Sequence, residues 1–220
     1  MHGSGGKSVY GIWLSNCYPC TTPMQAMRDR QSGLDEEVIE ATKAVYASAC
    51  RFNHSCRPNA HAAWNAKRGA QVIHALADIT TGSEISVSYL DNASGTRCAE
   101  RQEELGFVCV CDACSLSKPL LAESDTRRSR IGLIFGLLEA TVRKVDARAV
   151  ALLNERLRLM EQEEMKEDWN TLFCAASYFE LAGDRKQSRL WAARAADSAL
   201  HGLGADSDEF HHYMAHAARR

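Results

Sequence analysis

The sequence predicts an α+β protein in which a β-rich part is followed by a helical part, with the change near residue 118. Before that position, short β-type runs are separated by turn-like segments such as KRG, TTGS and DNASG. Three of the four prolines also fall in this first part, as expected of a loop-rich β domain. After residue 118, apolar residues recur at the three- and four-residue spacing of a helix.

Five segments of the first part are predicted as strands because they are rich in β-branched, aromatic or alternating apolar residues. In chain order they read SVYGIWL, AVYAS, NAHAAWN, AQVIHAL and EISVSYL. Between the first two, QSGLDEEVIEA is predicted to hold one short helix with Asp35 as its N-cap.

The second part is predicted to be helical throughout. Two apolar stripes have helical spacing: Ile131, Ile134, Phe135, Leu138 and Val142, then Val150, Leu153, Leu157 and Met160. The stretch DWNTLFCAASYFELAGDRKQSRLWAARAADSAL breaks at Ala-Gly-Asp, where Gly183 is a natural residue to follow a helix end. This pattern predicts a helix–turn–helix unit of the tetratricopeptide (TPR) kind. The segment EEMKED, residues 163–168, is predicted to be a solvated junction or a helix start.

The bulk composition is that of an ordinary globular protein, with 45% hydrophobic and 25% charged residues among 220. Lys and Arg number 26 against 28 Asp and Glu, so no basic excess favours nucleic acid or an anionic membrane as a partner. The sequence contains no run of about 18 apolar residues, so no transmembrane helix is predicted. The first residues also lack the apolar core of a signal peptide, so we expect an intracellular protein of the nucleus or cytoplasm.

Nine cysteines are many for such a chain, and three of them lie within six residues. Cys109, Cys111 and Cys114 form a C-x-C-x2-C pattern whose thiolates can converge on one metal ion. A structural zinc needs a fourth ligand, for which Cys56 is the first candidate and Cys98 the second. Buried inert thiols and an iron–sulfur cluster are the alternatives. The separate C-x2-C pair in NCYPC is expected to be plain cysteines.

Three motifs occur in the order found in one enzyme family. The first is Asn53-His54-Ser55-Cys56-Arg57-Pro58-Asn59, the second GSEISVSYLD at 82–91, and the third RQEELGFVCVCDAC at 101–114. They resemble the N-H-S-C-x-P-N motif, the G-E-E-L-x-x-x-Y-x-D segment and the post-SET zinc segment of SET-domain protein lysine methyltransferases. The approach AVYASACRFNHSC resembles the SET–MYND and fungal SET types. The resemblance is strongest over residues 43–117.

The resemblance implies a set of site residues. In this family the chain crosses itself around N-H-S-C to form a pseudoknot that holds S-adenosylmethionine. The matching cofactor contacts are Asn53, His54, Phe107 and Asn16. Tyr89 matches the active-site tyrosine, which orients the lysine amine. Cys56 is expected to join Cys109, Cys111 and Cys114 on a structural Zn²⁺ that fixes the post-SET segment.

The sequence also departs from the family pattern, because the glycine-rich G-x-G turn of the early SET strands is not recognisable. We therefore expect a partial SET domain at 1–108, a post-SET zinc segment at 109–117 and a TPR-like helical domain at 118–220. The predicted function is S-adenosylmethionine-dependent methylation of a lysine on a protein substrate, histone or other. The alternative is a catalytically inactive, zinc-stabilised interaction module. A zinc module for nucleic acid is disfavoured by the charge balance.

Overall fold

The computed structural model describes residues 17–20, 32, 43–91, 93–141, 147–166 and 168–219. The chain divides into two compact units: residues 1–52 with 62–73, and residues 53–61 with 74–220. The predicted strand SVYGIWL, the predicted helix after Asp35 and the candidate contact Asn16 lie outside the described residues. Among the described helices, none is both long enough and apolar enough to cross a membrane.

The first unit contains a short antiparallel pair, β1 (Cys17–Pro19) with β2 (Lys43–Val45). A 3₁₀ turn, η1 (Ala49–Arg51), follows β2, so AVYAS is a strand only at its start. The Tyr18 hydroxyl donates a hydrogen bond of 2.9 Å to the Ala49 carbonyl, which ties the turn to β1.

Strands β4 (Ala60–Asn65) and β5 (Ala70–Ala75) pair with each other, which confirms the predicted strands NAHAAWN and AQVIHAL. The predicted KRG turn joins them. The Asn65 side chain accepts a hydrogen bond of 3.0 Å from the Arg68 N–H, and Gly69 takes a φ of 57°. A tight hairpin turn often needs a residue with a positive φ, and glycine adopts this conformation without steric cost.

In the second unit, β3 (Asn53–His54) runs parallel to β6 (Ser86–Val87). The predicted strand EISVSYL is therefore reduced to two residues. The reason is that neighbouring backbone N–H groups donate to side chains instead of a strand: Ser86 to Asn59, Tyr89 to His54 and Leu90 to Ser88. Such local side-chain bonds compete with sheet pairing.

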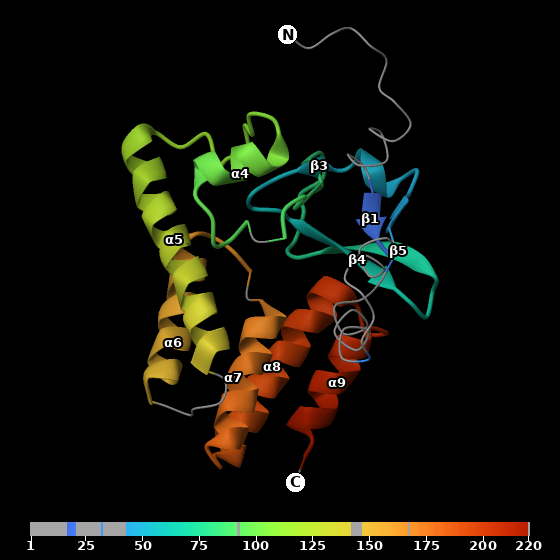
Figure 1. The fold of residues 1–220 in the computed structure, drawn as a ribbon. Coiled ribbons are helices and arrows are strands. Elements are labelled where there is room, and N and C mark those ends of the chain that lie inside the picture. Colours follow the sequence, from blue (N-terminus) through green and yellow to red (C-terminus); the bar gives the residue numbers. More distant parts are fainter. Residues whose placement is uncertain are drawn as a thin grey trace, which may run out of the picture. The chain divides into compact units, whose positions relative to one another are not determined.

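Helix α4 (Cys98–Leu105) ends at Gly106, whose φ of 70° is a typical helix stop. The long helices α5 (Lys118–Thr141) and α6 (Ala147–Gln162) follow and pack against each other (Figure 1). The predicted apolar stripes supply much of their buried surface, through Ile131, Ile134, Leu138, Leu153 and Met160.

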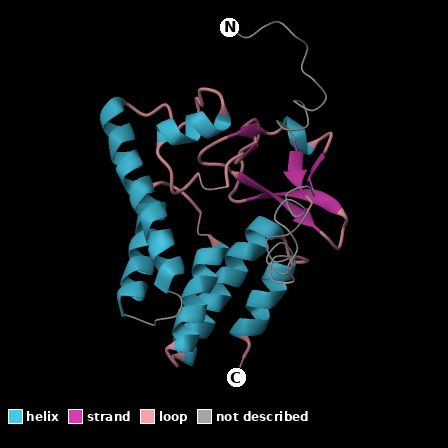
Figure 2. Ribbon diagram, in the orientation of Figure 1, coloured by secondary structure: helices cyan, strands magenta, loops and turns pink. Residues whose placement is uncertain are grey.

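The last three helices are α7 (Trp169–Leu181), α8 (Arg185–Leu203) and α9 (Asp208–Ala217). Gly183 has a φ of 76° between α7 and α8, which confirms the predicted break. Helix α8 packs against both α7 and α9, and Figure 2 shows how far helices dominate this part of the chain. That the helices form a TPR-like repeat stays a prediction.

Candidate functional site

Four cysteines from two separate segments meet in the second unit. Cys56 lies in the loop after β3, and Cys109, Cys111 and Cys114 lie in the segment after α4. Their sulfur atoms all lie within 4.8 Å of one another, and the sulfurs of Cys56 and Cys114 are 3.6 Å apart. A zinc–sulfur bond of about 2.3 Å gives a tetrahedral S···S edge of about 3.8 Å. The predicted ligand set therefore fits a zinc ion.

Cys98, the second candidate for the fourth ligand, does not belong to this group. Its thiol instead accepts a hydrogen bond of 3.2 Å from the Gln102 side-chain amide within α4. The structure thus favours Cys56 over Cys98 as the partner of the C-x-C-x2-C pattern.

A buried arginine lies beside the four sulfurs. The Arg101 side chain of α4 has no exposed surface, and its Nε donates to the Cys56 sulfur at 3.2 Å. One of its terminal nitrogens donates to the Cys114 sulfur at 3.5 Å, and the other donates to the Thr96 carbonyl. Burying a guanidinium is costly unless a counter-charge is near. Four thiolates and one Zn²⁺ together carry a net charge of −2, so they would supply the counter-charge that the buried Arg101 needs.

The thiols differ in how easily they lose their protons. Hydrogen bonds from Cys114 and Cys56 lower the pKa of the Cys111 thiol strongly. Hydrogen bonds to Cys111 raise the pKa of Cys56, and burial raises the pKa of Cys109 to about 11. Without a cation the cluster therefore favours one thiolate that accepts hydrogen bonds from its neighbours. Binding of a metal would release the remaining protons.

His54 connects the cysteine cluster to Tyr89. Its Nδ1 accepts a hydrogen bond of 3.0 Å from the Tyr89 backbone N–H, and its Nε2 lies 3.2 Å from the Cys56 sulfur. Because Nδ1 is an acceptor, the ring proton belongs on Nε2, which donates to the sulfur. Burial lowers the pKa of His54, which agrees with a neutral ring. Both ring nitrogens of His54 therefore make hydrogen bonds within the protein. What His54 can present to a ligand is its backbone and the face of its ring.

The remaining predicted residues lie on accessible surface. Asn53 is exposed, and its side-chain amide donates a hydrogen bond of 2.6 Å to the Glu84 carboxylate. The Tyr89 side chain is 45% exposed and that of Phe107 is 47% exposed. Phe107 follows α4 two residues before Cys109. The structure therefore connects His54 and the Tyr89 backbone with the cysteine cluster, and it leaves the Asn53 side-chain amide and the rings of Tyr89 and Phe107 accessible.

Several residues important to this geometry were not predicted from the sequence. Asn59 belongs to the predicted motif, but its role was missed: its amide donates to the Glu84 carbonyl at 2.9 Å and accepts from the Ser86 N–H, which ties the motif to β6. The fully buried Arg128 and Glu163 were missed as well. The prediction that 163–168 is a solvated junction is wrong for Glu163, because its carboxylate is enclosed by hydrogen-bond donors that are remote in sequence.

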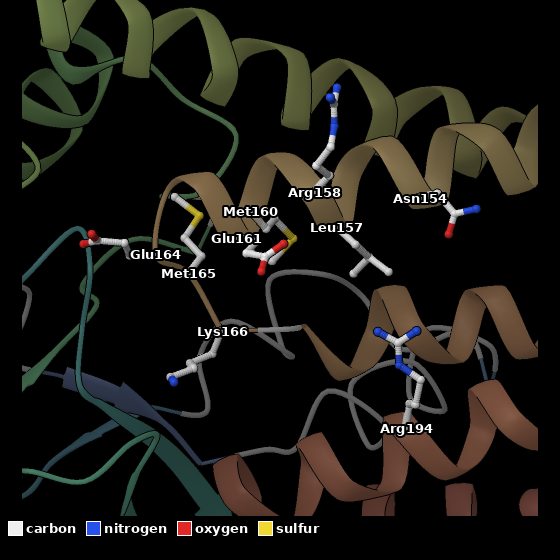
Figure 3. A pocket seen from close by; sticks show the side chains of 9 residues that line it. All are labelled: Asn154, Leu157, Arg158, Met160, Glu161, Glu164, Met165, Lys166 and Arg194. Carbon is white, nitrogen blue, oxygen red and sulfur yellow. The ribbon is translucent and has the colours of Figure 1, made fainter.

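A pocket of about 620 Å³ lies elsewhere in the helical part (Figure 3). Side chains of α6, of the turn after it and of α8 line it: Asn154, Leu157, Arg158, Met160, Glu161, Glu164, Met165, Lys166 and Arg194. None of the predicted site residues is among them. Its lining touches the motif at one point, because Glu164 also accepts a hydrogen bond of 3.1 Å from Arg57.

Comparison with known proteins shows that residues 12–90 match the SET domain family. The chain is 29% identical over 182 residues to the histone-lysine N-methyltransferase set5 of Schizosaccharomyces pombe, an alignment covering 78% of this chain and 56% of that protein. It is 37% identical over 140 residues to the human protein-lysine N-trimethyltransferase SMYD5, covering 54% of this chain and 31% of that protein.

A shorter match, 33% identical over 73 residues, links the chain to the histone-lysine N-methyltransferase ATXR4 of Arabidopsis thaliana. It covers 32% of this chain and 22% of that protein. The chain thus spans about half the length of the fission-yeast relative and less of the other two.

Proposed function

We propose that this chain, which carries a SET domain homologous to the fungal Set5 and SMYD5 lysine methyltransferases, is an S-adenosylmethionine-dependent protein lysine N-methyltransferase. One observation carries the proposal. His54 of the N-H-S-C motif is hydrogen-bonded at one ring nitrogen to Tyr89 and at the other to Cys56. The cofactor motif, the active-site tyrosine and the metal cluster implied by the resemblance are thereby joined.

When bound, S-adenosylmethionine supplies the electrophilic methyl group of a sulfonium for attack by a neutral lysine amine. The work of the protein in such a displacement is alignment and exclusion of water. The exposed Asn53 amide and the backbone of β3 are proposed to bind the cofactor, and the exposed Phe107 ring to stack on its adenine. Asn16 is proposed as a further contact.

Tyr89 is the proposed catalytic residue. Its backbone is fixed by His54, so its side chain is held at a defined place next to the motif. The hydroxyl is proposed to accept a hydrogen bond from the lysine amine and to orient the nitrogen lone pair. Because a charged ammonium cannot attack, an environment that favours the neutral amine supports transfer.

Zn²⁺ is the proposed structural cofactor, held by Cys56, Cys109, Cys111 and Cys114. Closed four-cysteine sites stabilise folds and leave no open position for catalysis. The ion would hold the segment that contains Phe107 next to the motif loop.

The partner is proposed to be a protein that presents a lysine, histone or other, in the nucleus or cytoplasm. The helical part from residue 118 is proposed as a TPR-like domain that contributes to partner binding, after a partial SET domain at 1–108 and a post-SET segment at 109–117. Neither a membrane nor a nucleic acid is proposed as a partner.

The test is titration of zinc-loaded protein with S-adenosylmethionine, followed by a methyl-transfer assay on lysine-containing proteins. Asn53→Ala is expected to weaken cofactor binding. Tyr89→Phe is expected to leave cofactor binding intact and to lower the transfer rate on the order of 100-fold, as removal of one transition-state hydrogen bond does. Tyr213→Phe is the control, because it removes a hydroxyl that donates to Asn170 in the helical part.

Two results would decide against the proposal. A folded, zinc-loaded protein that binds no cofactor would instead support the inactive interaction module. Equal transfer rates for Tyr89→Phe and Tyr213→Phe would remove Tyr89 from its catalytic role.

A further inference from the structure

The carboxylate of Glu163, the first residue after α6, is fully buried and accepts hydrogen bonds from three donors. It accepts hydrogen bonds from the Ser124 hydroxyl at 2.7 Å, from Arg127 Nε at 2.7 Å and from Arg128 Nε at 2.9 Å. Burial alone would raise the pKa of Glu163, but these hydrogen bonds and the charge of Arg128 lower it. The carboxylate therefore stays ionised inside the protein.

Arg128 links Glu163 to the N-H-S-C motif. Its guanidinium is fully buried and donates to two carbonyls besides Glu163: Ala93 at 2.6 Å and Cys56 at 3.4 Å. One side chain of α5 thus holds the backbone of the residue that also presents a thiol to the cysteine cluster.

Arg57 occupies the variable position of the motif N-H-S-C-x-P-N, and its guanidinium contacts Glu163 and the neighbouring Glu164. One terminal nitrogen donates to the Glu164 carboxylate at 3.1 Å, and the other lies 3.7 Å from the Glu163 carboxylate. Its side chain is mostly buried, with 17% exposed. Two consecutive residues of the motif are therefore anchored on the C-terminal end of α6.

The turn after α6 has an unusual backbone that makes this possible. Glu164 has a φ of 56° and is the one non-glycine residue with a positive φ in the described part of the chain. The Met165 N–H closes the turn on the Met160 carbonyl at 2.9 Å. Glycine is usual at such a position, so Glu164 adopts this conformation at a steric cost. Figure 3 shows Glu164 and Met165 at this turn.

We infer that Glu163 is a positioning residue for the motif loop: through Arg128 and Arg57 it fixes the backbone at Cys56 and hence the neighbouring Asn53 and His54. The inference rests on the proposed function as far as it concerns cofactor binding. Removing one partner of a buried ion network leaves the other charges uncompensated, so the guanidinium groups would move and release the loop.

The test compares Glu163→Gln with Glu155→Gln. Glu155 lies in α6, two turns before Glu163, and forms a two-pronged ion pair with Arg130 of α5, with both contacts at 2.8 Å. Both substitutions remove one negative charge from the α5–α6 pair, but Arg130 and Glu155 have no contact with the motif among the described interactions. Two quantities are measured for each: the dissociation constant for S-adenosylmethionine by calorimetry, and amide hydrogen exchange of residues 53–60.

Glu163→Gln is expected to weaken cofactor binding at least about tenfold and to speed exchange of this segment by a similar factor, with zinc still bound. Glu155→Gln is expected to match the wild type in both. Equal behaviour of the two variants would overturn the inference. If the wild type binds no cofactor, the proposed function fails, while the exchange rates still decide whether Glu163 positions the loop.

A second pair covers the case in which Glu163→Gln does not fold. Arg57→Gln and Arg127→Gln each remove one guanidinium from the surroundings of Glu163, but only Arg57 belongs to the motif. Faster exchange at 53–60 is expected for Arg57→Gln alone. The inference is overturned if both variants exchange alike.

Discussion

The loop-rich segment at 74–117, with the motif at 53–61, and the helices after residue 118 are stabilised by different interactions. One buried cluster of the first region consists of Cys56, Cys109 and Ala113, with Leu105, Cys111 and Cys114 packed against it. The helices bury large aliphatic side chains completely, including Ile131, Ile134, Leu153 and Leu172. Besides this cluster, Val87 and Leu90 are the large aliphatic residues buried among the described residues of the first region, so it gains less stability from apolar area than the helices do.

The loop-rich region is instead held by its cysteine sulfurs and by buried charges, of which Arg101 is its own and Arg128 comes from α5. Arg101 and Arg128 have no exposed surface, and each donates to Cys56, one to its sulfur and the other to its carbonyl. Directional bonds of this kind specify a geometry more sharply than apolar contact does, but they stabilise only when every partner is present. The candidate site therefore depends on a complete set of buried charges, some of them supplied by the helical part, whereas the packing of the helices on one another depends mainly on apolar volume.

Metal removal gives the largest expected effect and tests the first half of this comparison. If Zn²⁺ occupies the four thiols as proposed, its binding supplies folding free energy on the order of 10 kcal/mol. Chelation is expected to unfold residues 53–61 and 74–117, because Arg101 then faces thiols without the full thiolate charge. The helices are expected to persist, as measured by circular dichroism at the helical wavelength together with hydrogen exchange.

Re-addition of Zn²⁺ is the control and should restore slow exchange in the motif segment. Simultaneous loss of all helical signal on chelation would contradict the comparison, since it would mean that the helices have no stability of their own.

Leu172→Ala tests the other half, with an intermediate effect. Leu172 of α7 has no exposed surface, so its truncation should cost about 2–5 kcal/mol of unfolding free energy through lost burial and a cavity. Urea unfolding measures the cost, and zinc content is expected to stay unchanged. Leu181→Ala at the end of the same helix is the control, because that side chain is 62% exposed. Equal costs for the two variants would show that packed volume does not stabilise the helices.

The two regions also differ in how far the sequence predicted them. Helices α5 to α8 follow from apolar periodicity and from the glycine break at Gly183, because both signals are local. The four-cysteine cluster was predicted because C-x-C-x2-C is a contiguous pattern and Cys56 lies in a recognisable motif. The length of EISVSYL as a strand was not predictable, since Asn59 and His54 accept its backbone N–H groups from distant positions in the chain.

Buried charges were the other failure of sequence reasoning. A glutamate in EEMKED was expected to face solvent, because charged residues are rarely buried without a partner. For Glu163 the partners are on α5, more than thirty residues earlier in the chain. A pattern within one segment does not contain that information, so the positioning network emerged only from the structure.

His61 joins the two regions and gives the smallest expected effect. It belongs to β4, and its ring meets that of Trp169 in α7 edge-on at 5.0 Å. Burial and then the charge of His74 lower the pKa of His61 to about 4, against an opposing effect of Asp168. The folded protein thus keeps His61 neutral, while the unfolded chain binds a proton below pH 6.5. Stability is therefore lost as the pH falls from about 6.5 towards 4.

Between pH 7 and pH 5, this loss should amount to about 1–2 kcal/mol of unfolding free energy. His61→Phe keeps an aromatic ring against Trp169 but cannot bind the proton, so its unfolding free energy should fall less over the same interval. Urea unfolding of both proteins at the two pH values measures the difference, and protonation of the cysteine cluster contributes equally to each. An identical pH dependence would show that the contact between the strand and the helices is open enough to solvate a charged histidine. The two regions would then be joined chiefly by the buried arginines rather than by this aromatic contact.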